Sequence, residues 1–266
     1  MPELPEVEQV RKTLLPHIKG KTITKVEVYL DRLVKHPSSE QFIKNLTGRT
    51  IEDVCRRGKY LVLKTGVNQK LIVHLRMTGS LVAQASDLEA PPYAKIKFEL
   101  TDGVTMWFCD IRTFGTLYLV TDDDCYIAGY ETLGPEPLTV GFNPEYLAPI
   151  AAKSRKPIKT LILDQTVIAG LGNIYAGILP TRIANTLTRA EIEAVHEAAN
   201  KVIAQGIANR GTTFRDYKDG EGNKGDNQNH LLVYGRGGEP CKTCGEPLAT
   251  TKVGGRGTTY CAKCQH

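Results

Sequence analysis

The chain has 266 residues, of which 41% are hydrophobic and 24% are charged, as in ordinary soluble globular proteins. No apolar run approaches the roughly 18 residues that a membrane-spanning helix needs. The acidic start PELPEVE differs from the basic and apolar regions of a secretory signal, so we expect an intracellular protein. The formal charge of +5 permits nucleic-acid binding but does not establish it.

The first half of the chain predicts one helix followed by a β domain. Val7, Val10 and Leu14 recur at helical spacing directly after the N-terminus. From residue 22 to 120 the apolar period changes toward two, in short runs separated by turn signals: TITKVEVYL, YLVLK, KLIVHLRM, KIKFEL and GTLYLV. This pattern is typical of an antiparallel β-sandwich.

The second half predicts helices. Residues 129–150 are rich in Gly and Pro and indicate a linker. A helix is expected where four apolar residues share one face: Ile158, Leu161, Ile162 and Ile168. Thr188 and Glu191 have the spacing of a capping box in front of a second apolar stripe, formed by Ile192, Val195, Ala199, Val202 and Ile203. Residues 219–229 contain no apolar side chain and predict a mobile loop.

Four of the seven cysteines form two CxxC pairs, while Cys55, Cys109 and Cys125 are scattered. Sixteen residues separate the pair Cys241 and Cys244 from the pair Cys261 and Cys264. This spacing predicts a tetrahedral structural zinc site in preference to a redox dithiol. Between the pairs, the turn KVGGRGTT presents Arg256, which is either a phosphate ligand or a solvated side chain.

Pro2 and Glu3 are a further candidate pair. Removal of Met1 would expose the secondary amine of Pro2, a nucleophile that can form an iminium with an electrophilic carbon. Glu3 could then serve as acid or base. The alternative is structural, because Pro and Glu are both common in the first turn of a helix.

Several motifs occur together: MPELPEVE at 1–8, RRGKYL at 56–61, HLRMTG at 74–79, DIRTFG at 110–115, LGPEPL at 133–138, LDQTVIAGLGNIY at 163–175 and the CxxC pairs. In combination they closely resemble formamidopyrimidine-DNA glycosylases, bacterial repair enzymes that remove oxidised purines. The resemblance covers nearly the whole chain. Leu4 favours this branch over the related endonuclease VIII, which prefers oxidised pyrimidines.

The resemblance implies a role for each matching residue. Pro2 would attack C1′ of the damaged nucleotide, with Glu3 as proton donor. Lys59 would be the second proton donor, in β-elimination, and Arg256 would contact phosphate and assist δ-elimination. Met77, Arg112 and Phe114 match the residues that fill the space left by the everted base. Further DNA contacts are implied for His74, Tyr93, Arg155 and Asn173.

The resemblance also implies an architecture. We expect a catalytic β-sandwich domain at 1–130, a linker at 131–150, a helical DNA-binding domain at 151–230 and a four-cysteine zinc finger at 231–266. A loop near 215–229 would cap the lesion, and duplex DNA would lie between the domains. The implied protein is a monomer in the bacterial cytoplasm, associated with the nucleoid, with one structural zinc ion and no nucleotide or redox cofactor.

Two departures from the family pattern keep alternatives open. The run GNIYAGILP lacks about seven residues, close to two turns of the second helix of a helix-two-turn-helix motif. Tyr93 and Lys95 stand where relatives often have histidines. The alternatives are a catalytically impaired protein that binds damaged DNA, a glycosylase with endonuclease VIII-like specificity, and a zinc-ribbon interaction module. The last of these explains only the final residues.

Overall fold

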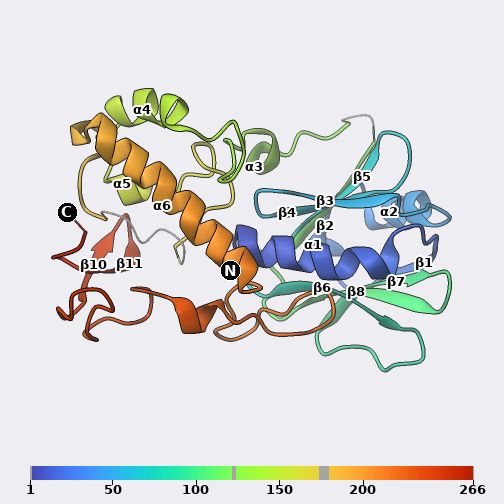
Figure 1. The fold of residues 1–266 in the computed structure, drawn as a ribbon. Coiled ribbons are helices and arrows are strands. Elements are labelled where there is room, and N and C mark those ends of the chain that lie inside the picture. The colour runs from blue at the N-terminus through green and yellow to red at the C-terminus, as the bar shows by residue number, and fades with distance from the viewer. Residues whose placement is uncertain (1, 122–123, 174–179, 266) are drawn as a thin grey trace. The chain divides into compact units, whose positions relative to one another are not determined.

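The computed structural model describes residues 2–121, 124–173 and 180–265. The chain forms two compact units (Figure 1). The first unit contains residues 1–131 and 209–226, and the second contains residues 132–208 and 227–266. Each unit is therefore built from two separate stretches of the chain, because residues 209–226 return to the first unit.

The first unit contains two β-sheets and the leading helix α1 (Leu4–Ile18). The four-stranded sheet has the order β1-β7-β8-β6, from Ile23–Val28, Ala94–Leu100, Val104–Asp110 and Gly79–Ala85. The five-stranded sheet has the order β2-β9-β5-β4-β3, from Val34–His36, Thr116–Thr121, Gln69–His74, Tyr60–Lys64 and Asp53–Arg57. Short helices lie at Asp31–Leu33 (3-10), α2 (Ser39–Leu46) and α3 (Ala128–Glu131).

Apolar side chains from both sheets and from α1 form one core. Val7, Val10 and Leu14 are each fully buried, so the predicted helical stripe is confirmed. The helix contacts β3 and β4 of one sheet and β6 and β8 of the other. In Figure 1, α1 runs between these two groups of strands. Helix α1 is therefore held by packing against both layers.

The predicted antiparallel β-sandwich is confirmed with one exception. The strand pairs are antiparallel except β2 with β9, which is parallel. The segment β2 has three residues and lies at the edge of its sheet. Three residues are too few to show an alternation of apolar and polar side chains, so the sequence does not predict the direction of this edge strand.

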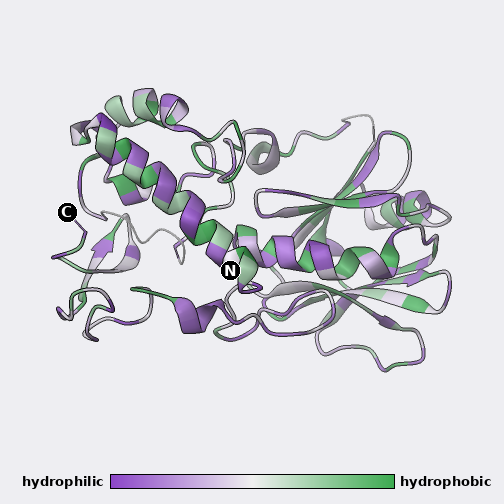
Figure 2. Ribbon diagram, in the orientation of Figure 1, coloured by the Kyte–Doolittle hydropathy of each residue, from purple (hydrophilic) through white to green (hydrophobic). Residues whose placement is uncertain are grey.

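The second unit is helical with a C-terminal hairpin. It contains α4 (Pro144–Ala152), α5 (Ile158–Ile162), α6 (Arg189–Ala208), 3-10 turns at Ala184–Thr186 and Asn227–His230, and the antiparallel pair β10 (Ala249–Val253) and β11 (Arg256–Tyr260). Figure 2 shows hydrophobic and hydrophilic residues alternating along α6. Among the described residues, no helix combines the length and apolarity required to cross a membrane.

The capping box before α6 is present. The backbone N–H of Thr188 donates to Glu191 Oε2 at 2.7 Å, and the N–H of Glu191 donates to Thr188 Oγ1 at 3.3 Å. By contrast, the helix expected through Ile168 ends at Ile162. The Asp164 carboxylate accepts hydrogen bonds from the backbone and hydroxyl of Thr166, at 3.1 and 2.7 Å, and this local turn competes with helix continuation.

The expected linker at 131–150 contains structured elements instead. Phe142 and Leu147 are buried, and α4 packs on α6. Pro144 begins α4, a position where its missing N–H costs nothing. The Gly and Pro content that suggested a linker therefore reflects turns around this helix.

The segment expected to be a mobile loop is anchored by polar contacts. Asp219 is 3% exposed, and its Oδ1 accepts the N–H groups of Glu221 and Asn223 at 3.0 and 2.8 Å. The N–H of Gly220 donates to Thr13 of α1 at 2.8 Å, and its carbonyl accepts from Ala83 at 2.9 Å. These hydrogen bonds fix the segment in place of apolar packing. A prediction from composition alone does not detect them.

Leu14 provides a test of the α1 packing. Leu14→Ala is expected to lower the free energy of unfolding of the first unit by about 2–5 kcal/mol, because it leaves a cavity in a fully buried position. Urea unfolding followed by fluorescence of Trp107 measures this unit, since Trp107 is the single tryptophan and lies in β8. The control is Leu88→Ala, at a residue 57% exposed, where a change within about 0.5 kcal/mol is expected. Equal effects of the two substitutions would contradict the packing described.

Candidate nucleic-acid interface and metal centre

The first candidate group lies at the start of α1, where Pro2 and Glu3 are both buried. Glu3 has extended backbone angles, and its N–H donates to Glu6 Oε2 at 2.7 Å. The other oxygen of Glu6 accepts the N–H of Thr212 at 2.7 Å. One buried carboxylate thus ties the N-terminal pair to the segment 209–226. Sequence reasoning missed Glu6, although its three-residue spacing from Glu3 is a capping-box signal.

Lys59 occupies a tight turn between β3 and β4 and is 5% exposed. Gly58 allows this turn with a φ of 57°. Arg56 donates to the Gly58 carbonyl at 3.0 Å and to Glu8 of α1 at 3.1 Å. Burial raises the pKa of Glu8, but hydrogen bonds and charges of Arg11 and Arg56 outweigh it, so the pKa lies below its ordinary value. Helix α1 therefore also braces the turn that carries Lys59.

His74 ends β5 and is 6% exposed. Burial, followed by the charges of Arg76 and Lys59, lowers the pKa of His74 from 6.5 to about 3. Its Nδ1 faces the backbone N–H of Arg76 at 2.9 Å and must accept from it, so the proton of the neutral ring is on Nε2. His74 can act as a neutral hydrogen-bond donor but not as a cation near pH 7.

Two neighbouring loops carry the predicted filling residues. Met77 and Phe114 are 41% and 53% exposed, which separates them from ordinary core residues. The guanidinium of Arg112 lies 4.8 Å from the centre of the Phe114 ring, within cation–π range. Exposed apolar side chains beside a cation suit insertion into a base stack.

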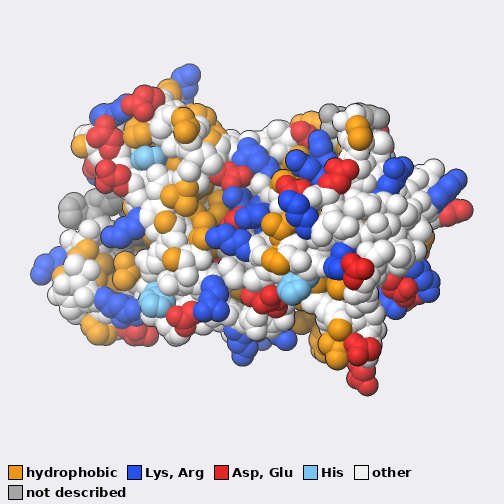
Figure 3. All heavy atoms as spheres, turned by 45° about the vertical axis from the view of Figure 1, so that its right-hand side comes forward, with side chains coloured by type: hydrophobic (Ala, Val, Ile, Leu, Met, Phe, Trp, Pro, Cys, Tyr) orange, Lys and Arg blue, Asp and Glu red, His pale blue; other side chains and the backbone are white. Residues whose placement is uncertain are grey.

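A hollow of about 530 Å³ adjoins these loops. Its lining includes three cationic side chains that sequence reasoning missed, Arg32, Lys35 and Arg76, and none of the lining residues is acidic. Arg76 lies within the motif HLRMTG, but Arg32 and Lys35 lie in no motif, because the turn at Asp31–Leu33 and β2 reach the loops only through the fold. On the face drawn in Figure 3, by contrast, basic, acidic and hydrophobic side chains are interspersed. The local cluster of cationic side chains around the hollow therefore indicates where an anionic ligand could bind, whereas the net charge of the chain does not.

In the second unit, Arg256 is exposed at the start of β11, after two glycines with φ of 56° and 75°. Buried Lys159 donates to Thr258 Oγ1 at 2.9 Å, and Asn173 Nδ2 donates to the Gly257 carbonyl at 3.3 Å. Asn173 and Arg256 are thus brought to one hairpin. Lys159, which sequence reasoning did not single out, holds the same hairpin.

Two further predicted contacts are Arg155, in the second unit, and Tyr93, which lies beside the end of β8 in the first unit. Arg155 is exposed in the segment between α4 and α5. Tyr93 is 57% exposed with a φ of 61°, and its carbonyl accepts the N–H of Asp110 at 3.1 Å. The roles of all these residues stay predictions.

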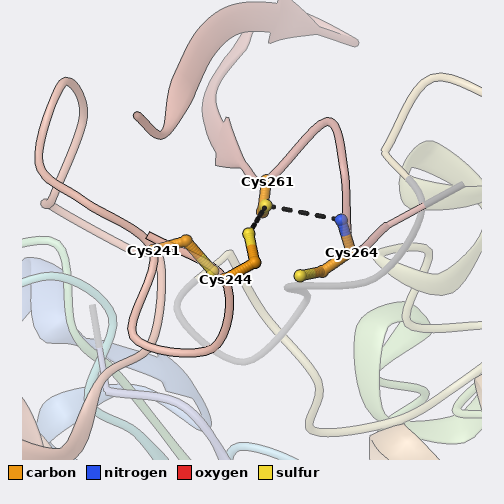
Figure 4. Close-up of side chains that lie close together, drawn as sticks. All are labelled: Cys241, Cys244, Cys261 and Cys264. Atoms are coloured by element: carbon orange, nitrogen blue, oxygen red, sulfur yellow. Dashed lines mark hydrogen bonds between the residues drawn. The ribbon is translucent and has the colours of Figure 1, made fainter. Parts of the chain in front are cut away.

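The four cysteines of the CxxC pairs converge, with their sulfur atoms within 4.8 Å of one another (Figure 4). A tetrahedral zinc–thiolate site has sulfur atoms about 3.8 Å apart, as follows from Zn–S bonds of about 2.3 Å. The N–H groups of Thr243 and Cys264 donate to the sulfurs of Cys241 and Cys261, each at 3.4 Å, and such bonds favour thiolates. The donor set fits a closed structural metal site.

Comparison with known proteins defines the class first and then the family. Three family models match in chain order: the formamidopyrimidine-DNA glycosylase N-terminal domain (residues 1–117), the formamidopyrimidine-DNA glycosylase H2TH domain (133–218) and a zinc finger found in FPG and IleRS (238–266). This is the domain set of a DNA-repair glycosylase. The chain belongs to the formamidopyrimidine-DNA glycosylase family.

Individual relatives agree. A formamidopyrimidine-DNA glycosylase from Geobacillus kaustophilus is 44% identical, and one from Desulforamulus reducens is 42% identical, each covering 100% of this chain and at least 99% of the relative. A solved complex of the Lactococcus lactis Fpg with DNA containing an abasic site matches with a TM-score of 0.91 and 36% identity over 99% of both chains. The chain is therefore an enzyme of DNA repair in a family that binds DNA.

The shortened run GNIYAGILP falls largely on residues 174–179, which lie outside the described residues. The alignment with the Desulforamulus relative spans 274 positions, more than the 266 residues of this chain, so gaps in this chain face residues of the relative. The H2TH model nevertheless matches across the shortened run. These matches do not favour the catalytically impaired alternative.

Burial of His74 in its neutral form predicts a pH dependence of stability. The folded-state pKa is about 3 and the ordinary value is 6.5, so the unfolded state binds more protons between these values. Stability should therefore fall as the pH decreases below about 6.5. From pH 6.5 to 5, the wild type is expected to lose about 1–2 kcal/mol more than His74→Gln does. Urea unfolding at both pH values measures this difference, and parallel losses in the two proteins would contradict it.

Proposed function

We propose that the protein is a bifunctional DNA glycosylase and abasic-site lyase that excises oxidised purines, such as 8-oxoguanine and formamidopyrimidines, from duplex DNA. The observation that carries the proposal is the buried Pro2–Glu3 pair, held by Glu6 at the start of α1 in a chain of this family. The fixed backbone of Glu3 restricts where its carboxyl group can lie, as a proton donor requires.

In the proposed first step, the Pro2 nitrogen bonds to C1′ as the bond from C1′ to the base breaks. The electron pair of the broken bond leaves with the base, which takes up the proton that the Pro2 nitrogen loses. The ring oxygen O4′ then departs from C1′ with a proton from Glu3, and the C1′=N iminium forms. Attack requires the free secondary amine of Pro2, and therefore removal of Met1.

Elimination then cleaves the strand. Loss of a C2′ proton expels the 3′ phosphate in β-elimination, and we assign proton transfer in this step to Lys59. Its buried position in a braced turn supports this role. A second, δ-elimination expels the 5′ phosphate, with Arg256 as its phosphate contact. Water hydrolyses the remaining iminium and regenerates Pro2, so a gapped strand is the product.

The everted base leaves space in the duplex, which we assign to Met77, Arg112 and Phe114. Unstacking costs a few kcal/mol per step, and inserted apolar side chains offset that cost. Arg112 can donate hydrogen bonds to the cytosine opposite the lesion. The exposure of Met77 and Phe114 supports this assignment.

Phosphate contacts are proposed for His74, Asn173 and Arg155, and a further DNA contact for Tyr93. The neutral Nε2–H donor of His74 and the shared hairpin of Asn173 and Arg256 support the first two. Solved relatives from Lactococcus lactis are bound to DNA that contains an abasic site or a Fapy-dG lesion. We also propose that residues 215–229 cap the lesion. The backbone of this segment is anchored to α1 at Gly220. The exposed side chains of the segment, rather than its backbone, would therefore move to cover the everted base.

We propose that the metal is a single zinc ion with a structural role. It would be held by Cys241, Cys244, Cys261 and Cys264, and it would fix the β10–β11 hairpin that presents Arg256. The mechanism requires no nucleotide or redox cofactor. We further propose that the protein acts as a monomer in the bacterial cytoplasm, associated with the nucleoid, since its curated relatives are bacterial.

A borohydride trap tests the chemistry. The purified protein, with removal of Met1 verified by mass spectrometry, is mixed with duplex that contains 8-oxoguanine opposite cytosine and is then reduced. A covalent adduct mapped to Pro2 is expected. Glu3→Gln should slow adduct formation on the 8-oxoguanine duplex by at least about 100-fold, because O4′ must then depart without a proton from Glu3, while it still forms the adduct on duplex with a preformed abasic site, whose aldehyde form already has an open ring. An adduct on another residue would overturn the mechanism.

The same assay with a thymine glycol duplex tests specificity, and faster excision of thymine glycol would show endonuclease VIII-like preference. Duplex binding without any strand nicking would instead support the catalytically impaired alternative.

The metal assignment has its own test. Metal analysis of the wild type is expected to find about one zinc per chain, and Cys244→Ser should lose most of it. Duplex binding should weaken at least about tenfold, because the small core of the zinc module consists mainly of Cys241, Leu248 and Cys261. Cys125→Ser is the matched control, since Cys125 lies outside the cluster, and it should retain both zinc and binding. Full zinc content in Cys244→Ser would contradict the four-cysteine site.

A further inference from the structure

The two loops that carry the filling residues are joined by half-buried Thr78 and buried Asp110. Asp110 is 1% exposed at the end of β8, and Thr78 directly follows Met77. The two loops also meet in the sheet, where Gly79 of β6 pairs with Asp110 of β8. A group placed here can hold both loops at once.

The Asp110 carboxylate and the Thr78 hydroxyl are linked to each other and to the backbone of the loop at 110–115 by hydrogen bonds. Asp110 Oδ1 accepts from the Thr78 hydroxyl at 2.6 Å and from the Arg112 N–H at 3.2 Å. Asp110 Oδ2 accepts from the Gly115 N–H at 2.8 Å. The Thr78 oxygen in turn accepts from the Arg112 N–H at 2.9 Å. Thus three groups that belong to the two loops converge on one carboxylate.

The loops need this support because their backbones are unusual. Arg76 and Thr113 both have a φ of 55°, a region that side chains other than glycine rarely adopt. A Cβ on Gly79 would lie 2.4 Å from the Leu75 carbonyl oxygen, and one on Gly115 would lie 2.5 Å from Cζ of Phe108. Such close-packed, strained turns persist only where surrounding contacts fix them.

We propose that Thr78 and Asp110 are positioning residues that set discrimination of the base opposite the lesion. This inference rests on the proposed function, in which Arg112 hydrogen-bonds that base. The pair fixes the backbone N–H of Arg112 relative to Met77, and the cation–π contact with Phe114 then restrains the guanidinium. Hydrogen-bond readout of a base edge depends on this placement, and a good bidentate contact is worth about 10- to 100-fold in discrimination.

The chemistry of Thr78 supplies a matched pair of variants. Its hydroxyl donates to Asp110 and accepts from Arg112 at the same time. Thr78→Val keeps the shape but loses both functions, whereas Thr78→Ser keeps both. Asp110→Asn keeps one acceptor oxygen and places an amino group where the other oxygen accepts a hydrogen bond, so it should act in the same direction as Thr78→Val.

The experiment measures single-turnover excision of 8-oxoguanine opposite cytosine and opposite adenine, together with nicking of duplex that already contains an abasic site. Wild type is expected to favour cytosine. Thr78→Val should lower the cytosine-to-adenine ratio about tenfold, Thr78→Ser should stay within about twofold of wild type, and abasic-site nicking should be little changed in either variant. Thermal unfolding checks that all variants are folded.

The outcomes separate this inference from the proposed function. An unchanged ratio in folded Thr78→Val, with an active wild type, overturns the positioning role alone. Equal losses of excision and of abasic-site nicking also overturn it, because they indicate a general structural effect. Absence of both excision and nicking in the wild type overturns the proposed function, and this inference with it.

Discussion

The first unit depends on one buried carboxylate, that of Glu6. Its two oxygens accept backbone N–H groups from Glu3 and from Thr212, which lies 206 residues further along the chain. Backbone donors left without acceptors in a buried place cost about 1–3 kcal/mol each, so both segments are held strongly. The same residue therefore fixes the N-terminal pair and the point at which residues 209–226 join the first unit.

The same physical device recurs at two other irregular segments of the first unit. Asp110 gathers donors from the loops at 75–79 and 110–115, and Asp219 gathers two N–H groups of the turn that follows it. In the second unit, buried Lys159 plays a complementary role by donating to Thr258 in strand β11 of the zinc hairpin. Loops have few apolar contacts, so buried polar groups with satisfied hydrogen bonds are the available means of fixing them.

The difference between elements held by apolar packing and loops held by buried polar groups explains which features the sequence predicts. The α1 stripe, the five strands β1, β4, β5, β7 and β9, and the α6 capping box follow from apolar period and local chemistry, and the cysteine spacing predicted the cluster that Figure 4 shows. The early end of α5, caused by Asp164, and the anchoring of residues 219–226 by Thr13 and Ala83 depend on particular hydrogen bonds. Arg32 and Lys35 joined the candidate site only because β2 brings them there. No local pattern encodes such distant contacts.

The arrangement separates two kinds of residue on the same loops. The side chains of Met77, Arg112 and Phe114 are exposed, so substitutions there should change DNA binding with little effect on folding. Thr78 and Asp110 make the hydrogen bonds that define the loop geometry. A loop supported in this way can meet a deformed duplex without rearranging, which avoids the entropic cost of ordering it on binding. The strained turns at Arg76 and Thr113 are consistent with this preorganisation, because an unsupported loop would relax out of them.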